Sequence, residues 1–341
     1  FRMTDVHFET ASTGWRVGQF FRITKTGDGG LNWSEQLPQP QLGTTGLAAI
    51  AFKPGGLDGI SVGAPDNRAQ PHTDYTSQPK ILLTDDGGAT SWREPTLVTL
   101  LESGITDGRT LRDVKWAAGD DFWAVGEGGT VLQSTNNGNT WIQHDPSAVV
   151  SSLAKISFEG VAFLNSQNGV VVGESSEGSA VAAAYEESSG TITWYDIKPS
   201  SGTVLQLTDV KMLGNSAYAT GEEEISGVRV GAVYRSDYTG GTFGAFVKIP
   251  SQPIFAACTV GGDLGRIPIL NEIATNASNG DLWVGGECGR VWRMTSSGTW
   301  TEFKSQTSGH VIGMSLTSSG HLYVSSMRQD ETQHGLVRWT P

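Results

Sequence analysis

The chain has 341 residues, a formal net charge of −12, 45 glycines and only 17% charged residues. This acidity argues against nucleic acid and anionic membranes as partners, because both repel negative charge. No apolar run approaches the roughly 18 residues that a membrane-spanning helix needs, so we expect no transmembrane segment. Many glycines with few charges are typical of short strands joined by tight turns.

A short apolar pattern that ends in Val-Gly or a close variant recurs along the whole chain. Its seven copies end at Gly18, Gly63, Gly126, Gly173, Gly221, Gly285 and Ser325. The spacing is near the roughly 45 residues that one four-stranded propeller blade needs. A second apolar run precedes each copy, as at 4–8 and 111–116, and a third follows, as at 130–133.

The sequence therefore predicts an all-β fold, a seven-bladed β-propeller of four-stranded antiparallel blades, as a single domain over residues 1–341. We call the strands of a blade a, b, c and d from the centre outward. The expected blades span approximately residues 1–40, 41–105, 106–150, 151–200, 201–252, 253–305 and 306–341.

Three stretches between strands c and d fit the pattern Ser/Thr-x-Asp/Asn-x-Gly-x-x-Trp, the second with one extra residue. The pattern suits a hairpin turn in which Asp or Asn accepts backbone N–H groups, Gly takes a positive φ, and Trp packs the turn onto its blade. The residues expected to have this structural role are Thr26, Asp28, Gly30, Trp33, Thr84, Asp86, Gly88, Trp92, Ser134, Asn136, Gly138 and Trp141.

With these boxes the chain resembles the Asp-box, or BNR-repeat, propellers. The stretch 122–129, which runs into the third box, looks like a blade of the photosystem II assembly-factor type of propeller, a group with many secreted relatives. The resemblance implies the fold. It leaves the function open, because Asp-boxes are turn devices shared by sialidases, xyloglucanases, sorting receptors and scaffolds.

The connections of a propeller divide between two faces. The d–a and b–c connections share one face, here called the upper face, and the a–b and c–d turns share the lower face. Several upper-face connections are long, among them 64–79, 94–110, 143–157 and 249–270, and Glu222–Arg229 is assigned to the b–c connection of blade five. We expect a short, uniform lower face and binding on the upper face, although the long connections also fit tolerated insertions. The candidate binding residues are Arg68, Tyr75, Arg112, Asp113, Asp209, Arg229, Arg266 and Glu272.

Acidic residues recur where strand a begins, near the central axis. Asp5, Asp113 and Asp209 hold equivalent positions, and Glu272 lies near that position in blade six. Such a ring could hold a cation or a basic side chain. Alternatively, its carboxylates cap backbone donors at the strand entry.

Two classes of function compete. A sialidase-like enzyme is suggested by Arg266-Ile267-Pro268 and by the adjacent Tyr185-Glu186, but no two further arginines complete a carboxylate-binding triad. No carboxylate pair stands out for another glycosidase. We therefore expect a noncatalytic binding or assembly scaffold that recognises a protein or a glycan, without cofactor or metal. A polysaccharide-active glycoside hydrolase is the alternative.

The chain has two cysteines, Cys258 and Cys288, and both fall in upper-face connections of blade six. We predict a disulfide between them that pins the 249–270 connection and places the protein in an oxidising compartment, such as a periplasm, a lumen or the exterior. Two unrelated buried thiols are the alternative.

Blade seven shows only three strand patterns, near 311–316, 321–326 and 335–340, before the sequence given ends. The expectation is that this blade lacks strand d or receives it from residues upstream of Phe1. An unpaired edge there could accept a partner's strand.

Overall fold

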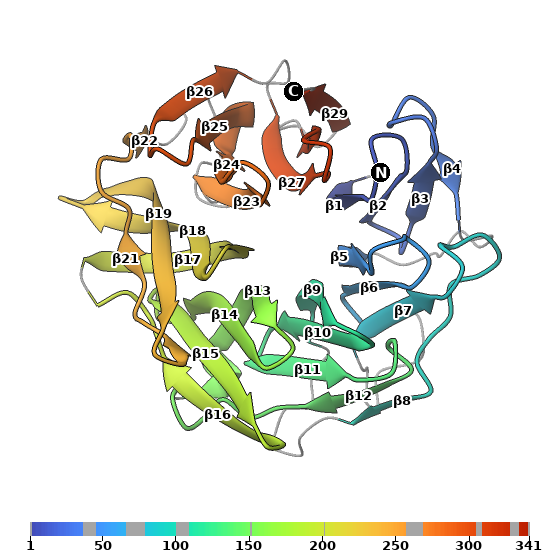
Figure 1. Cartoon of the computed structure of the whole chain (residues 1–341), viewed down its shortest axis with the longest axis horizontal. Helices are drawn as coiled ribbons and strands as arrows, with labels where there is room; N and C mark the ends of the chain where they lie inside the picture. The colour runs from blue at the N-terminus through green and yellow to red at the C-terminus, as the bar shows by residue number, and fades with distance from the viewer. Residues whose placement is uncertain are drawn as a thin grey trace.

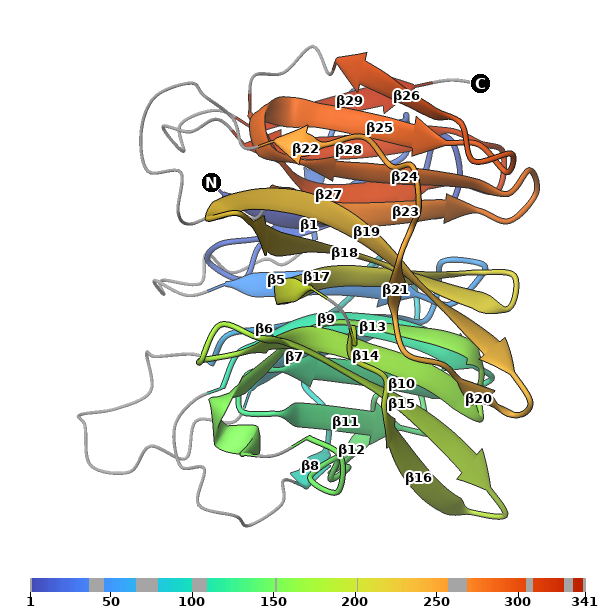
Figure 2. The same cartoon turned by 90° about the vertical axis from the view of Figure 1, so that its left-hand side faces the viewer.

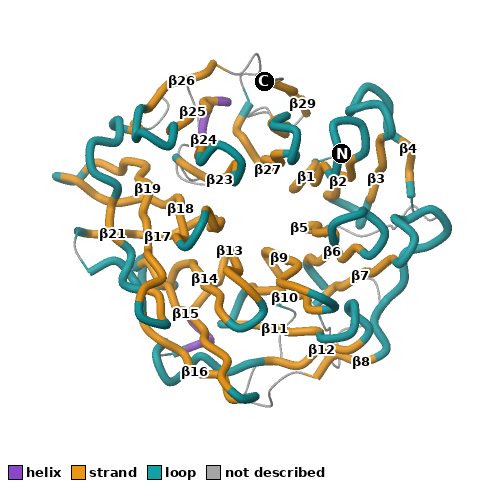
Figure 3. Tube along the Cα trace, in the orientation of Figure 1, coloured by secondary structure: helices purple, strands orange, loops and turns teal. Residues whose placement is uncertain are grey.

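The computed structural model describes residues 2–36, 46–65, 79–99, 109–150, 152–200, 202–256, 269–304, 309–327 and 334–339. Antiparallel sheets stand around a central opening like the blades of a propeller, with the first strand of each sheet innermost (Figure 1). Strands and loops make up nearly all of the described chain, apart from the short 3-10 turns η1 (Leu153–Lys155) and η2 (Glu287–Gly289) (Figure 3). No helix among the described residues is long and apolar enough to cross a membrane.

The strands of the first four blades follow one another from the centre outward. Blade one comprises β1 (Met3–Phe8), β2 (Gly14–Gly18), β3 (Ile23–Thr26) and β4 (Ser34–Glu35). Blade two comprises β5 (Leu47–Phe52), β6 (Gly59–Gly63) and β7 (Lys80–Thr84). Blade three comprises β9 (Leu111–Ala118), β10 (Asp121–Gly126), β11 (Thr130–Ser134) and β12 (Thr140–Gln143), and blade four β13 (Ile156–Asn165), β14 (Asn168–Ser175), β15 (Ala180–Ser188) and β16 (Thr191–Asp196).

The remaining blades continue this order. Blade five comprises β17 (Thr203–Leu213), β18 (Ser216–Ile225), β19 (Val228–Thr239) and β20 (Thr242–Phe243), with β21 (Val247–Lys248) and β22 (Phe255–Ala256) also paired to β19. Blade six comprises β23 (Leu270–Asn276), β24 (Asp281–Gly286), β25 (Arg290–Met294) and β26 (Trp300–Lys304), and blade seven β27 (His310–Leu316), β28 (Leu322–Met327) and β29 (His334–Trp339). The predicted seven-bladed all-β propeller is confirmed, and the described residues of blades two and seven contribute three strands each.

The recurring glycine of strand b is explained by a bulge in strand a. In all seven blades the pairing of strands a and b shifts by one residue near the start of strand a. A Cβ at Gly18 would lie 2.1 Å from the carbonyl oxygen of Arg2, and one at Gly173 would lie 2.0 Å from that of Ser157. Six blades have glycine at this position, where a Cβ would collide with the backbone of strand a, and in blade seven Ser326 lies there, opposite Val311. In blade six this role falls to Gly286, one residue later than the pattern indicated.

The hydrophobic core is divided into seven clusters, and each cluster lies between two neighbouring blades. Between blades one and two, for example, Trp15 stacks on Phe52 with ring centroids 3.9 Å apart. A single blade has no core of its own, so the blades stabilise one another around the ring.

The three Asp-boxes close the predicted turns. The hydroxyl of Thr26 accepts the N–H of Gly30 (2.9 Å), Asp28 accepts the N–H of Asn32 (2.8 Å), and Trp33 donates its indole N–H to the carbonyl of Gly30 (3.0 Å). The third box repeats all three bonds. In the second box the extra residue displaces the indole, and the Nε1 of Trp92 is buried without a hydrogen-bond partner.

One expectation about the connections is wrong. The lower face is not uniform, because the c–d turns of blades four and five are extended hairpins, β15–β16 and β19–β20 (Figure 2). Within the long 94–110 connection, β8 (Leu97–Thr99) pairs in parallel with β12 of blade three. A strand that follows blade two in the chain therefore forms the outer edge of blade three.

Candidate functional site

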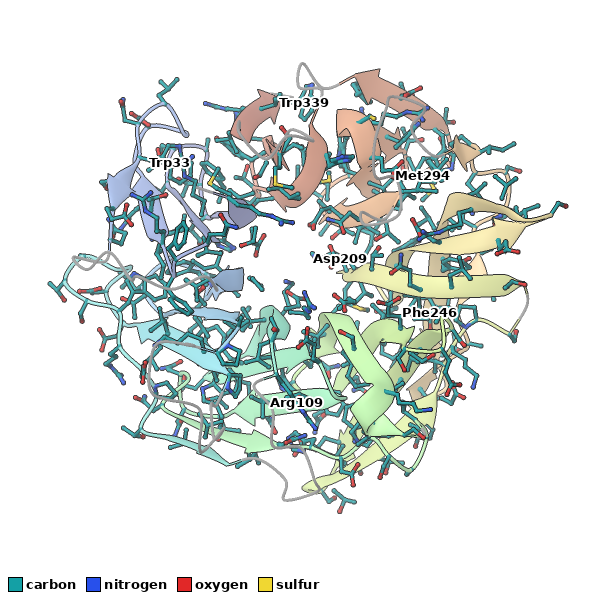
Figure 4. The ribbon with its side chains drawn as sticks, turned by 180° about the vertical axis from the view of Figure 1, so that it is seen from behind. Trp33, Arg109, Asp209, Phe246, Met294 and Trp339 are labelled. Carbon is teal, nitrogen blue, oxygen red and sulfur yellow. The ribbon has the colours of Figure 1, made fainter. Side chains whose placement is uncertain are left out.

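The bulge in strand a places one residue of each blade at an equivalent position beside the central channel. These residues are Asp5, Ala49, Asp113, Gly160, Asp209, Glu272 and Gly313. The three aspartates therefore occupy equivalent positions, and Glu272 occupies the same position in blade six. Figure 4 shows Asp209 at the inner rim of its blade, beside the central opening.

Each aspartate of this ring joins two blades. Asp5 accepts the N–H of Val6 on its own strand (2.7 Å) and the N–H of Ile50 in blade two (2.9 Å). Asp113 accepts the N–H of Val161 in blade four (3.1 Å) in the same way, and Asp209 accepts the N–H of Ile273 in blade six (3.2 Å). The carboxylates thus cap backbone donors, and the donors include those of the neighbouring blade.

Two lysines outside the predicted binding residues lie two residues beyond the ring. Lys211 donates to both carboxylate oxygens of Asp209 at 2.7 and 2.8 Å, and Lys115 pairs with Asp113. The nearby Asp113, Asp209 and Asp5 raise the pKa of Lys115 despite the opposing effect of burial. In the sequence, the repeated Asp-Val-Lys of blades three and five indicates that a lysine accompanies the aspartate in both blades.

The channel encloses a cavity of about 360 Å³ in which negative charge exceeds positive charge. Four carboxylates of the ring line it, together with the two lysines. Arg112 and Glu159 also lie on the lining. Burial raises the pKa of Asp5 to about 6 although Lys115 opposes the shift. Burial, with Asp209 and Asp5, raises the pKa of Glu272 well above its usual range. The described part of the chain holds no group of three or more His, Cys, Asp or Glu side chains arranged for a metal ion.

A band of charged side chains of both signs crosses blades three to five beside the ring. Arg112 forms ion pairs with Glu127 (2.5 Å) and Glu159 (4.0 Å). Glu127 is itself held by the backbone N–H of Thr110 at 3.0 Å. The side chain of Arg112 keeps 41% of its surface exposed, so its guanidinium faces solvent while its partner is fixed.

Arg229 repeats this arrangement in blade five. It pairs with Glu222, whose side chain is fully buried and also accepts the N–H of Ile269 (2.5 Å), while 41% of the Arg229 side chain is exposed. Between the two arginines, burial raises the pKa of Glu174, and Glu159 adds to the shift. The charged band is defined as Arg112, Glu127, Glu159, Glu174, Glu222 and Arg229.

The assignment of Glu222–Arg229 to a long polar connection is wrong. Glu222, Glu223 and Glu224 lie on β18 and Arg229 lies on β19, joined by a tight hairpin in which Ile225 pairs with Val228. The strands of this blade continue farther than the polar sequence indicated, because Glu222 and Glu223 are buried and paired with Arg229 and Lys248.

Four of the predicted residues, Arg68, Tyr75, Arg266 and Cys258, lie outside the described residues. Cys288 is disulfide-bonded, and the chain contains no cysteine other than Cys258 to pair with it internally. The pairing with Cys258 stays a prediction.

The adjacent Tyr185 and Glu186 do not form a nucleophile pair. Tyr185 is 2% exposed, packs against Trp123, and donates its hydroxyl to the carbonyl of Ser166. Burial raises the pKa of this phenol. Glu186 accepts the hydroxyl of Tyr195 instead (3.0 Å). The sialidase-like use of this pair is therefore without support in its geometry.

Comparisons with known proteins agree with the architecture. Residues 76–181 match the family described as Photosynthesis system II assembly factor YCF48. A solved structure named "YCF48 bound to D1 peptide" is similar over 99% of this chain and 93% of that chain, with 16% sequence identity and a TM-score of 0.61. YCF48 from Cyanidioschyzon merolae is similar over 99% of this chain and 95% of that chain, with 15% identity and a TM-score of 0.61. No curated protein matches. The chain is thus an Asp-box propeller that resembles propellers of the photosystem II assembly-factor type.

Proposed function

We propose that the protein is a noncatalytic assembly propeller that binds a polypeptide segment of a partner protein on its upper face. The observation that carries this proposal is the charged band. Arg112 and Arg229 each expose 41% of their side chains, while their carboxylate partners are fixed by backbone N–H groups. Half-exposed arginines on a rigid support are common anchors for protein partners.

A protein partner fits this surface better than a glycan. The band carries two arginines and four carboxylates across three blades, so it offers charges of both signs to a polypeptide that carries both. One solved propeller of similar fold is named as bound to a peptide, which supports the same class of ligand here. The proposed activity requires no bond to be broken, and Tyr185, the candidate nucleophile, is buried in the core.

We further propose an extracytoplasmic location. The support is the disulfide at Cys288, because disulfides persist mainly in oxidising compartments. Reductant should therefore lower the unfolding temperature of the native protein.

Selection of displayed random short peptides on the whole chain tests the binding proposal. We expect selected peptides to lose about tenfold or more in affinity for Arg112→Ala. Arg22→Ala is the matched control, because Arg22 also forms an exposed ion pair, with Glu35 at 2.7 Å, but it directly precedes β3 in blade one, away from the charged band. Equal affinity of the peptides for the parent and for Arg112→Ala would contradict the proposal. So would hydrolysis of a glycan panel that Glu174→Gln abolishes.

A further inference from the structure

Beyond β20, which pairs with the end of β19, the outer edge of blade five is covered by two further short segments with a break between them. Tyr234 and Arg235 of β19 pair with β21, and Val230 and Gly231 pair with β22. Between these segments the backbone of residues 250–254 leaves the edge of β19. No other blade in the described ranges has its outer strand divided in this way.

A side chain completes the hydrogen bonding at this break. Val233 donates its N–H to the Oε1 of Gln252 (2.8 Å), and the carbonyl of Val233 accepts the N–H of Ile249 (2.9 Å) and the Nε2 of Gln252 (3.3 Å). The backbone of β19 therefore has no free groups at Val233 for a partner's strand. A ligand here must be bound through side chains and not by strand addition.

The break encloses an open, mainly apolar pocket of about 460 Å³, here called the blade-five pocket. Four large hydrophobic side chains in and beside it are exposed: Ile225 (50%), Val228 (60%), Val247 (62%) and Ile254 (81%). The described residues expose only eight such side chains to this degree, so half of them gather on one blade of seven. A cluster of this kind on a rigid rim indicates an interaction site. The pocket is lined by Ile225, Val230, Gly231, Lys248, Ile249, Pro250, Ser251, Gln252, Pro253 and Ile254.

The charges around the pocket indicate what kind of group binds in it. Each nearby cation is paired with a carboxylate: Arg229 with Glu222, Lys248 with Glu223, and Arg235 with Asp237. The surroundings therefore offer no excess positive charge to the anionic headgroups of a membrane. A second copy of the chain would carry the same net charge of −12 and be repelled. These charges favour an uncharged apolar group from a different molecule.

The pocket also continues the charged band outward. Ile225 and Val228 pair at the tip of the hairpin that carries Glu222 and Arg229. A segment that binds at Arg229 therefore reaches the pocket with its next few residues.

We propose that the blade-five pocket binds a bulky aliphatic or aromatic side chain of the partner segment, which sits beside the residues that contact the charged band. This inference rests on the proposed function and adds a requirement for an apolar anchor. Burying one such side chain in a preformed pocket contributes much of the affinity of a short peptide.

The test uses peptides selected on the whole chain, as above, and measures their affinity for Ile254→Asp. We expect a loss of about tenfold or more, and we expect alanine at the bulky residue of the peptide to cause a similar loss. Leu31→Asp is the matched control, because Leu31 is 84% exposed at a distant Asp-box and should leave the affinity unchanged. Both positions are exposed, so neither variant should alter the unfolding temperature by much.

The outcomes separate this inference from the proposed function. Peptides that lose affinity for Arg112→Ala but not for Ile254→Asp would overturn the apolar anchor and leave the proposed function standing. Peptides insensitive to both variants, or no selected peptides, would overturn both. A dimer in sedimentation that Ile254→Asp dissociates, or binding to neutral phosphatidylcholine vesicles that it abolishes, would replace the partner segment by a second copy or a lipid surface.

Discussion

The indole N–H of Trp15 in blade one donates a hydrogen bond of 3.1 Å to the carbonyl of Gly87, in the Asp-box of blade two. The other two boxes also contact the preceding blade. A Cβ at Gly30 would lie 2.4 Å from Leu336 of blade seven, and one at Gly138 would lie 2.6 Å from Ile60 of blade two. The Asp-boxes therefore close a turn within one blade and pack that turn against the blade before it.

Gly138→Ala should destabilise the protein more than Gly190→Ala. Both glycines have a φ of 79°, so both variants acquire similar backbone strain. A Cβ at Gly138 would also collide with Ile60, whereas nothing lies within 4 Å of a Cβ at Gly190. We expect the collision to cost about 1–3 kcal/mol more, measured as the difference in unfolding free energy in urea. Equal losses would show that the box contacts its neighbour without stabilising it.

Asn136→Ala should lower the unfolding free energy by about 1 kcal/mol, because it removes the acceptor for the N–H of Thr140. Asp28→Ala should also lower stability, by loss of the bond from the N–H of Asn32. Neither variant should change peptide affinity. A loss of affinity at constant unfolding temperature would mean that the boxes take part in binding.

Glu272→Gln should raise the unfolding temperature near pH 7, and the gain should shrink as the pH falls toward about 4. Burial and the neighbouring Asp209 and Asp5 raise the pKa of Glu272 in the folded protein. Asp5 behaves likewise, with a pKa of about 6 against an ordinary value of 3.8. A carboxyl group whose pKa is higher in the folded than in the unfolded protein destabilises the fold as the pH rises from its unfolded pKa through its folded pKa.

His144 contributes in the opposite direction. Burial lowers its pKa to about 4 from 6.5, so its contribution is full above about pH 6.5 and is lost as the pH falls. Comparing Glu272→Gln with the parent at each pH removes this shared contribution. A gain that is independent of pH would show that Glu272 is not the titrating group.

The unfolded protein should show no free thiols without reductant. In the chain-entropy model, a bridge between Cys258 and Cys288 contributes about 3–4 kcal/mol, so Cys288→Ser should lower the unfolding free energy by a similar amount. Two titrating thiols would remove the bridge and the argument for an oxidising compartment.

The sequence predicts the blades well because each blade repeats a local steric requirement. In six blades the glycine of strand b meets the bulge of strand a in the same way, as Gly18 and Gly173 show, and this repeated steric requirement makes the glycine recur in the sequence. The ring of Asp5, Asp113 and Asp209 is visible for the same reason. Lys115 and Lys211 were visible too, as Asp-Val-Lys, but their importance depends on the enclosed channel.

Contacts between blades could not be predicted in this way. Asp5 accepts the N–H of Ile50, which lies 45 residues later in the chain. This bond depends on how the sheets of blades one and two are placed relative to each other. Glu222 and Glu223 were misplaced because consecutive carboxylates are typical of loops. The arginine and lysine that make their burial favourable come from later in the chain.

The hydrogen bonds of the three aspartates connect some pairs of neighbouring blades and leave other pairs without such a bond. Carboxylates join blade one to two, three to four, and five to six. In the described residues, the channel-side bonds of blade seven come from the amide of Asn271 to the carbonyl of Val311 (3.3 Å) and from the N–H of Phe8 to the hydroxyl of Ser315 (2.8 Å). By these carboxylate bonds alone, the propeller comprises three doublets and one single blade. Cooperative opening should begin at that single blade, and amide hydrogens of β27 and β28 should exchange before those of β9 and β13.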